Sequence, residues 1–142
     1  KVGLGETALL ETGLDSILSI SRGSDGYLYS SRSIDGGRNW ELPKKMSILG
    51  HPANLIEIDK NKILCTYGYR IKPIGIRAVI LDKRTLNISS NTFILRKNGV
   101  GNPFDSGYPM TLMLNDSTFF TTYFFTSDDK VTHIAGTRWS IN

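Results

Sequence analysis

The sequence has few cysteines and histidines, and it has no long apolar segment. Its single cysteine, Cys65, excludes an internal disulfide and any metal site built from several cysteines, and we expect a small buried side chain there. With only two histidines, His51 and His133, the chain offers no histidine cluster for a metal, so neither a metal nor a cofactor is expected. No apolar run approaches the roughly 20 residues of a membrane helix, so no membrane span is expected.

Neither acidic nor basic residues are concentrated in any part of the sequence. The 142 residues include 17 basic and 13 acidic side chains, with a net charge of +4, and no basic block is longer than the two lysines of "PKK". Scattered basic residues without a recognition helix do not favour a nucleic-acid partner, and a small anionic ligand suits this balance better. The length and the 39% hydrophobic content predict one folded unit.

Helical periodicity is almost absent, and short runs rich in Ile, Leu, Tyr, Phe and Thr alternate with clusters of Gly, Asn, Asp and Ser. This pattern predicts an all-β protein. The expected strands cover residues 7–11, 16–22, 27–33, 53–57, 62–69, 76–82, 110–114, 118–125 and 133–140.

The expected strands fall into three similar units. Each begins with Gly and a polar or aromatic residue, followed by an apolar strand, a tight turn and a second apolar strand; the units start at Gly5, Gly50 and Gly107, 45 and 57 residues apart. Such periods are typical of propeller blades. We therefore expect a single partial propeller domain of about three four-stranded blades, with units at about 1–46, 47–100 and 101–142.

One loop, "SRSIDGGRNWELP", carries the order Ser33, Asp35, Gly37, Trp40. Asp followed by two glycines can bind backbone amides within a turn and accept positive φ, and Trp40 is expected to pack under the hairpin. A calcium or catalytic loop is the alternative, but one carboxylate is too few for a hard cation. The loop is interpreted as the fastening of a repeated β-unit.

Three polar residues occupy equivalent positions at the start of the three units: Glu6, His51 and Tyr108. In a propeller these strand starts surround the central channel, so the three side chains are expected to converge where a ligand binds. The ordinary alternatives are an exposed carboxylate, a packed histidine and a tyrosine that covers an apolar layer. Asp105, just before "SGYP", is expected to brace its turn.

At this point the residues resemble a known family. The segment "SIDGGRNW" resembles the Asp-box, or bacterial neuraminidase repeat. The series "GETALL…SISR", "GHPANL…CTYGYRIKPIGIRAV" and "FDSGYPMTLML…TTYFF…HIAGTRWSI" resembles the C-terminal half of sialidase-like six-bladed propellers over nearly the whole chain. The resemblance implies a glycoside hydrolase that removes terminal sialic acid or a similar anionic sugar, with a carbohydrate as its partner, and it slightly favours a secreted or periplasmic location.

The resemblance also implies roles for individual residues. Tyr108 in "DSGYP" matches the family's tyrosine nucleophile and Glu6 the glutamate that assists it. Arg22 matches one of three arginines that clasp the substrate carboxylate, with Arg77 as the candidate for another and Arg70 as the alternative. No residue matches the first arginine or the acid/base aspartate, which the family carries in N-terminal blades.

A phenol nucleophile suits a sialoside because the sugar's carboxylate lies beside the anomeric carbon and would repel an Asp or Glu nucleophile. With an unperturbed pKa of about 10, the phenol needs a neighbouring base and positive charge, which Glu6 and the arginines would supply. Arginine also binds a carboxylate through two parallel hydrogen bonds.

Two further questions stay open from sequence. The chain can be a sialidase-type enzyme, a non-catalytic carbohydrate-binding or interaction propeller, or a related glycosidase of different specificity. Three blades cannot close a ring, so we expect either the rest of a longer chain or a homodimer that completes a six-bladed ring.

Overall fold

The computed structural model describes residues 1–100, 102 and 106–141, which form eleven strands in three antiparallel sheets. The first sheet contains β1 (Leu4–Gly13), β2 (Ser16–Gly23), β3 (Tyr27–Ser33) and β4 (Lys44–Leu49). The second contains β5 (His51–Asp59), β6 (Lys62–Tyr69), β7 (Ile74–Asp82) and β8 (Phe93–Gly99), and the third β9 (Gly107–Asn115), β10 (Thr118–Thr126) and β11 (Thr132–Ser140). Across the described part of the chain, we find no helix long and apolar enough to cross a membrane.

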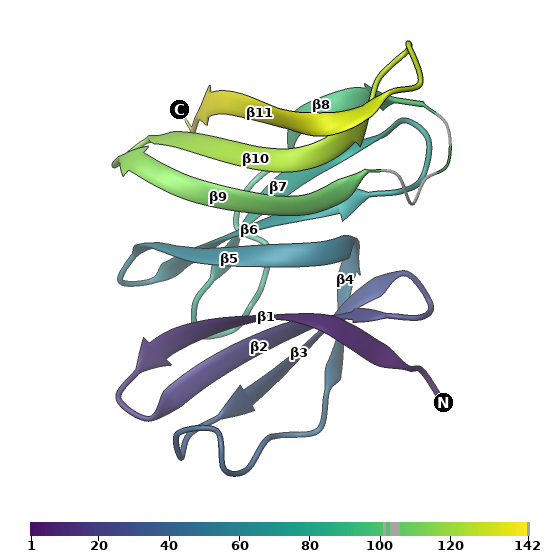
Figure 1. Ribbon diagram of the computed structural model, residues 1–142. Coiled ribbons are helices and arrows are strands. Elements are labelled where there is room, and N and C mark those ends of the chain that lie inside the picture. The colour runs from purple at the N-terminus through teal and green to yellow at the C-terminus, as the bar shows by residue number, and fades with distance from the viewer. Residues whose placement is uncertain (101, 103–105, 142) are drawn as a thin grey trace.

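The sheets are stacked with their first strands side by side. Strand β5 contacts both β1 and β9, and Figure 1 shows these three strands one above another along the same edge of the stack. The strands of each sheet follow in sequence order away from that edge. The all-β class and the propeller-like arrangement of the sheets are therefore confirmed.

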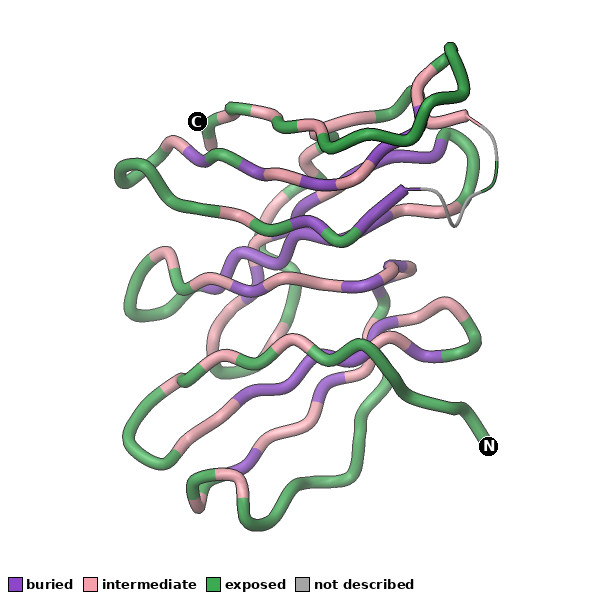
Figure 2. Tube along the Cα trace, viewed as in Figure 1, coloured by how far each residue is buried: buried purple, intermediate pink, exposed green. Residues whose placement is uncertain are grey.

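Apolar side chains fill the spaces between neighbouring sheets. Residues 63–68 of strand β6 are all buried. Because successive side chains of a strand point in opposite directions, β6 is buried on both of its faces. Its Ile63, Cys65 and Tyr67 join the core shared with the first sheet, whereas Leu64 packs with Phe119 of the third sheet. Figure 2 shows the buried segments gathered in the middle strands of the stack. Cys65 is fully buried, as the sequence predicted.

The sequence pattern predicted nine of the eleven strands and missed the last strand of the first and of the second sheet. Strands β3 and β6 have the predicted bounds, but β4 and β8 were not among the nine expected strands. The segment "KKMSIL" of β4 is mostly exposed, so its side chains lack the apolar alternation of a buried strand. In the third sheet the described residues form three strands rather than the four expected.

The outer face of the third sheet is apolar and exposed. Alternation along β9, β10 and β11 turns one set of side chains away from the second sheet. Four large members of that set are Met110 (63% exposed), Leu112 (62%), Phe120 (39%) and Ile134 (77%). A contiguous apolar face of this kind is typical of a surface that another element covers.

Candidate functional site

The candidate site lies where the three inner strands begin. Strands β1, β5 and β9 start on the same side of the stack, to the right in Figure 1. Glu6, His51 and Tyr108 occupy these starts. The propeller arrangement therefore brings together residues that lie far apart in the sequence.

The backbone is irregular at two of these residues. Glu6 has φ of 47° and Tyr108 has φ of 52°, both in the left-handed region that residues other than glycine seldom occupy. Each lies within a register shift of its strand pair, between Gly5 and Thr7 in β1 and after Gly107 in β9. A β-bulge redirects side chains, and left-handed residues store roughly 1–3 kcal/mol of strain each, which is often found at functional sites. The two bulges aim Glu6 and Tyr108 at each other.

Glu6 links a phenol to a guanidinium. The hydroxyl of Tyr108 donates a short hydrogen bond to Oε1 of Glu6. The other carboxylate oxygen, Oε2, lies 2.9 Å from Nε of Arg22. Arg22 pairs with Gly5 in the β1–β2 register, so the first sheet delivers both the acid and the arginine. The side chains are partly accessible to solvent, Glu6 at 29% and Arg22 at 31%.

The ring of Tyr108 is held by stacking. It lies 5.5 Å from the ring of Phe124, with 29° between the planes, and Tyr108 as a residue remains 47% exposed. Phe124 pairs with Gly107 across β9 and β10, which places its ring beside the bulge. Sequence reasoning did not single out Phe124; its alternation with Tyr123 and Phe125 in β10 is the signal that could have done so.

Arg70 brings a second positive charge to the site. It follows the end of β6, and its Nε donates to the carbonyl oxygen of Ser106 at 3.4 Å, just before β9. Burial and the nearby charge of Arg22 lower the pKa of the Arg70 guanidinium. A guanidinium stays protonated at neutral pH even so. Ser106 was also missed from sequence, and Asp105, expected to brace this turn, lies outside the described residues.

The pKa of Tyr108 is raised, chiefly by the hydrogen bond to Glu6 and next by burial. The positive charges of Arg70 and Arg22 act in the opposite direction. The phenol is therefore protonated at neutral pH, and a carboxylate is already in place to receive its proton. A hydroxyl in contact with a general base is the usual arrangement for an activated oxygen nucleophile.

His51 lies within the electrostatic reach of the same groups. Burial lowers the pKa of its imidazole, the charges of Arg70 and Arg22 lower it further, and Glu6 opposes them. The ring is therefore neutral at pH 7. Its buried Nδ1 has no hydrogen-bond partner among the described residues.

Arg77 lies apart from this group. It pairs with Tyr67 in the β6–β7 register, and its guanidinium carbon lies 3.3 Å from the ring centre of Tyr69. Both tyrosines belong to the core shared with the first sheet. Because Arg77 pairs with Tyr67, its side chain lies on the face of the second sheet that packs against the first sheet. The structure thus places the alternative, Arg70, near Tyr108, and not the first candidate.

The Ser33–Trp40 loop is fastened by its own hydrogen bonds. Oδ1 of Asp35 accepts from the Ser33 hydroxyl at 2.8 Å and from the Asn39 amide at 2.9 Å, and the Gly37 amide donates to Ser33 Oγ at 2.9 Å. These bonds hold the pKa of Asp35 at about 2, with those from Asn39 contributing most. Gly37 has φ of 88°, as the turn requires. Trp40 donates to the Gly37 carbonyl and is 41% exposed, so its indole is partly covered at this turn.

The site combines a phenol hydroxyl, a carboxylate in contact with it and two guanidinium groups. Among the described residues, no group of three or more His, Cys, Asp or Glu side chains could hold a metal ion. The cluster can accept a proton from the phenol at Glu6 and can bind an anion at the arginines.

Comparison with solved structures identifies the fold of the chain. A protein of unknown function from Dyadobacter fermentans is 31% identical, with a TM-score of 0.88, over 100% of this chain and 39% of that chain. A mutant NanB sialidase from Streptococcus pneumoniae is 14% identical, with a TM-score of 0.65, over 94% of this chain and 23% of that one. NanB in complex with 2-[(3-chlorobenzyl)ammonio]ethanesulfonate is also 14% identical, with a TM-score of 0.63, over 99% and 23%. The chain has the fold of a sialidase-like β-propeller.

The same comparisons set the extent of the likeness. This chain spans 39% of the Dyadobacter protein and 23% of the NanB chains, well under half of each. No protein-family model matches the sequence, and no curated protein matches it. The structural likeness therefore establishes the fold, and the chemistry must be argued from the residues.

Proposed function

We propose that this chain carries part of the active site of a sialidase-type glycoside hydrolase that acts on terminal sialic acid or a similar anionic sugar. The observation that carries the proposal is the contact of the Tyr108 hydroxyl with Glu6, which also binds Arg22. A phenol hydrogen-bonded to a carboxylate, on two strained bulges of separate sheets, is difficult to explain as packing alone.

The proposed reaction begins at Tyr108. Its phenol oxygen attacks the anomeric carbon while its proton moves to Glu6, and the bond to the leaving group breaks. A water molecule then attacks the anomeric carbon and gives its proton to the group that protonated the leaving oxygen, the bond from the sugar to Tyr108 breaks, and the proton on Glu6 returns to the phenol oxygen. The nucleophile is neutral until it reacts, so the carboxylate of the sugar does not repel it.

Arg22 and Arg70 would bind that carboxylate. The salt bridge to Glu6 uses Nε of Arg22, whose side chain is 31% exposed, so its terminal nitrogens can donate to a ligand. Arg70 adds a second charge next to Tyr108. The NanB structure with an ethanesulfonate ligand gives a parallel, since a sulfonate is also a compact anion.

Two further groups are needed, an acid to protonate the leaving oxygen and the remaining arginine of the clasp. We propose that sheets outside this chain supply them and complete the ring, with residues 1–46, 47–100 and 101–142 acting as three consecutive blades. The apolar outer face of the third sheet, with Met110 and Ile134 exposed, supports such a covering sheet. The extra sheets would belong to a longer chain or to a second copy; a light-scattering mass twice that of the chain would support the second copy, and a stable monomer in dilute solution would exclude it.

The test is hydrolysis of a panel of sialosides by the intact protein. We expect turnover by the unaltered protein and by Tyr27→Phe, which removes a phenol hydroxyl elsewhere on the first sheet. Tyr108→Phe should lose at least about 100-fold in kcat, the lower range for loss of a catalytic group. Full activity of Tyr108→Phe would refute the assigned nucleophile.

A non-catalytic carbohydrate-binding propeller is the second candidate. It is favoured by the absence of any match to the acid/base aspartate and to one arginine in this sequence. Saturable sialoside binding without turnover by the intact protein, lost in Arg70→Gln, would support it. Turnover of another anionic sugar in place of sialic acid would instead identify a glycosidase of different specificity.

We further propose that the Ser33–Trp40 loop is an Asp-box. The hydrogen bonds that loop amides donate to Asp35 and Ser33 support a structural role for it. Replacement of Asp35 should therefore lower stability and leave the KM for substrate unchanged in the folded protein.

A further inference from the structure

A second polar site lies at the opposite end of the sheets. The hairpin between β1 and β2 and the hairpin between β5 and β6 flank a cavity of about 300 Å³. These hairpins are at the left in Figure 1, whereas β1, β5 and β9 start at the right. The cavity is therefore separate from the Tyr108 site, and nothing in the proposed reaction uses it.

Every residue that lines this cavity is polar or charged. Hydroxyl and amide groups come from Thr12, Ser16 and Asn61. Four basic side chains face one acidic one, Asp82, and the basic residues are Arg32, Lys60, Lys83 and Arg84. The lining lies at the tips of the hairpins, where Lys60, Asn61 and Arg84 are exposed, and it suits a polar rather than an apolar ligand.

The positive charge in the cavity is only partly neutralised. Lys83 binds Glu57, with Nζ 2.5 Å from Oε2. Oδ1 of Asp82 accepts hydrogen bonds from the Arg84 amide and from the amide and hydroxyl of Thr85, within its own turn. Lys60 and Arg84 form no salt bridge with any described residue. Asp82 offsets part of the Arg84 charge, and the pKa of the Asp82 carboxyl is lowered chiefly by the hydrogen bonds from Thr85 and also by the charge of Arg84. An anion would meet the positive charge that remains.

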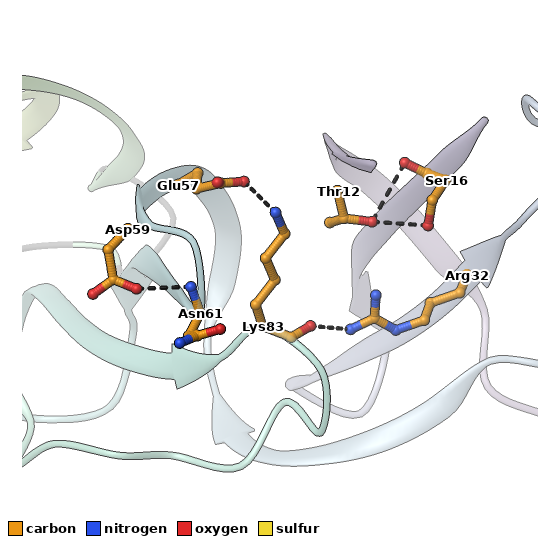
Figure 3. A network of polar contacts seen from close by, with 7 residues as sticks. All are labelled: Thr12, Ser16, Arg32, Glu57, Asp59, Asn61 and Lys83. Carbon is orange, nitrogen blue, oxygen red and sulfur yellow. Dashed lines mark hydrogen bonds and ion pairs between the residues drawn. The ribbon is translucent and has the colours of Figure 1, made fainter. Parts of the chain in front are cut away.

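The donors are also held in position. Figure 3 shows Arg32 reaching across the boundary, where its guanidinium donates to the carbonyl oxygen of Lys83 at 2.5 Å. On the first sheet the hydroxyls of Thr12 and Ser16 pair at 3.0 Å. The first sheet thus presents donors whose positions are fixed, and preorganised donors lose little entropy when a ligand binds.

We propose that this cavity binds a tetrahedral oxyanion, the sulfate or phosphate group of a small molecule. The lining offers as donors the hydroxyls of Thr12 and Ser16, the guanidiniums of Arg32 and Arg84 and the ammonium of Lys60. Donors from two sheets suit an anion with oxygens in several directions better than a planar carboxylate. A neighbouring cavity of about 460 Å³ shares Arg32 and Arg84 and provides room for the rest of such a molecule.

The test is calorimetric titration of the intact protein with inorganic sulfate, inorganic phosphate and a sulfated monosaccharide, with ionic strength held constant by chloride. We expect saturable binding of at least one probe. Tighter binding of the sulfated sugar than of sulfate would identify a sugar sulfate as the ligand, and equal binding would identify the free oxyanion.

Variants locate the site. Lys60→Gln and Arg84→Gln should each weaken binding by about tenfold, which corresponds to about 1.4 kcal/mol. Arg138→Gln, which removes the same charge from the exposed strand β11, should change it by no more than about twofold, the usual range for a distant surface substitution. Arg32 is avoided because it links the two sheets, and thermal melts without ligand confirm that each variant is folded.

Two results would overturn the proposal. One is the absence of saturable binding for all three probes. The other is an equal loss in Arg138→Gln, which would show attraction to the overall positive charge rather than a site. Neither result bears on sialoside hydrolysis at Tyr108.

Discussion

The hydroxyl of Tyr108 binds the carboxylate of Glu6, although the two residues are 102 positions apart and belong to the third and first sheets. Each adopts a left-handed backbone conformation at a register shift of its own strand. The contact forms because strand β5 packs against both β1 and β9, which brings the starts of these two strands close together. The site is thus a product of sheet stacking and of two local bulges.

The hydrogen bond from Tyr108 to Glu6 predicts how the phenol titrates. The Tyr108 pKa is raised above 10.0, so its proton should be lost at higher pH than those of ordinary tyrosines. Glu6→Gln removes the carboxylate charge and should lower this pKa. The difference in tyrosinate absorbance between the protein and Tyr108→Phe isolates the signal. An unchanged midpoint in Glu6→Gln would contradict the assigned contact.

The raised pKa also fixes the sign of its effect on stability. The folded state holds the Tyr108 proton more tightly than the unfolded chain, so its contribution is complete below pH 10 and is lost as pH rises through the folded pKa. Glu6→Gln should flatten this alkaline loss in thermal melts. A steeper loss of stability at alkaline pH in Glu6→Gln would contradict the prediction.

Arg70 and Arg77 provide a matched pair of arginines. Arg70 acts on Tyr108 electrostatically, whereas Arg77 lies on the ring of Tyr69. Arg70→Gln should raise KM for a sialoside by at least about tenfold, about 1.4 kcal/mol, because it loses a carboxylate contact. Arg77→Gln should leave KM nearly unchanged. The reverse ranking in steady-state kinetics would show that the clasp uses Arg77.

Gly68 is predicted to be intolerant of a side chain. An added Cβ would lie 2.1 Å from the carbonyl oxygen of His51 and 3.1 Å from Cα of Gly107, so two inner strands would have to move. Gly68→Ala should lower the free energy of unfolding by about 1–3 kcal/mol and reduce activity. Gly5→Ala is the control, because its Cβ would meet nothing within 4 Å. Denaturant titration of both variants checks this, and equal stability would contradict it.

Neighbouring phenylalanines of β10 face opposite directions. Phe119 is fully buried against Trp139, with ring centres 5.0 Å apart, and Phe120 is 39% exposed. Phe119→Ala should lower the free energy of unfolding by about 3–5 kcal/mol. Phe120→Ala should change it by about 0.5 kcal/mol or less while its face is open. A large loss for Phe120→Ala in the intact protein would show that another sheet covers this face.

Asp35 predicts an acid-sensitive loop. Its pKa of about 2, against an ordinary 3.8, means that it stabilises the folded state above pH 3.8 and that this effect is lost as pH falls toward 2. Asp35→Asn should lower the melting temperature at neutral pH and reduce the difference between neutral and acid melts. Asp128→Asn, on an exposed turn, should do neither. If the two variants melt alike, the loop bonds do not fasten the sheet.

Much of the fold was accessible from sequence because alternation and turn residues mark the inner strands. Strand β6 was predicted with its bounds, since "KILCTYGY" is buried on both faces and ends at turns. Strands β4 and β8 were missed because edge strands have mixed burial and their pairing depends on the neighbouring strand. Propensity does not report such tertiary context.

The site was accessible only in part. The repeated glycine just before Glu6, His51 and Tyr108 pointed to these residues, but nothing in the sequence marks a left-handed residue in a bulge. The sequence alone does not show which arginine lies near Tyr108: Arg70, which follows β6, or Arg77 in β7. The β6–β7 register makes the distinction, because it places Arg77 opposite Tyr67. Register, rather than residue type, decides which arginine reaches the site.

The role of Tyr108 as nucleophile is tested most directly by mass spectrometry of the intact protein quenched during sialoside turnover, followed by peptide mapping. We expect a sugar attached to the phenol oxygen of Tyr108, with no such adduct in Tyr108→Phe. Attachment of the sugar to another side chain, or wild-type turnover by Tyr108→Phe, would contradict it.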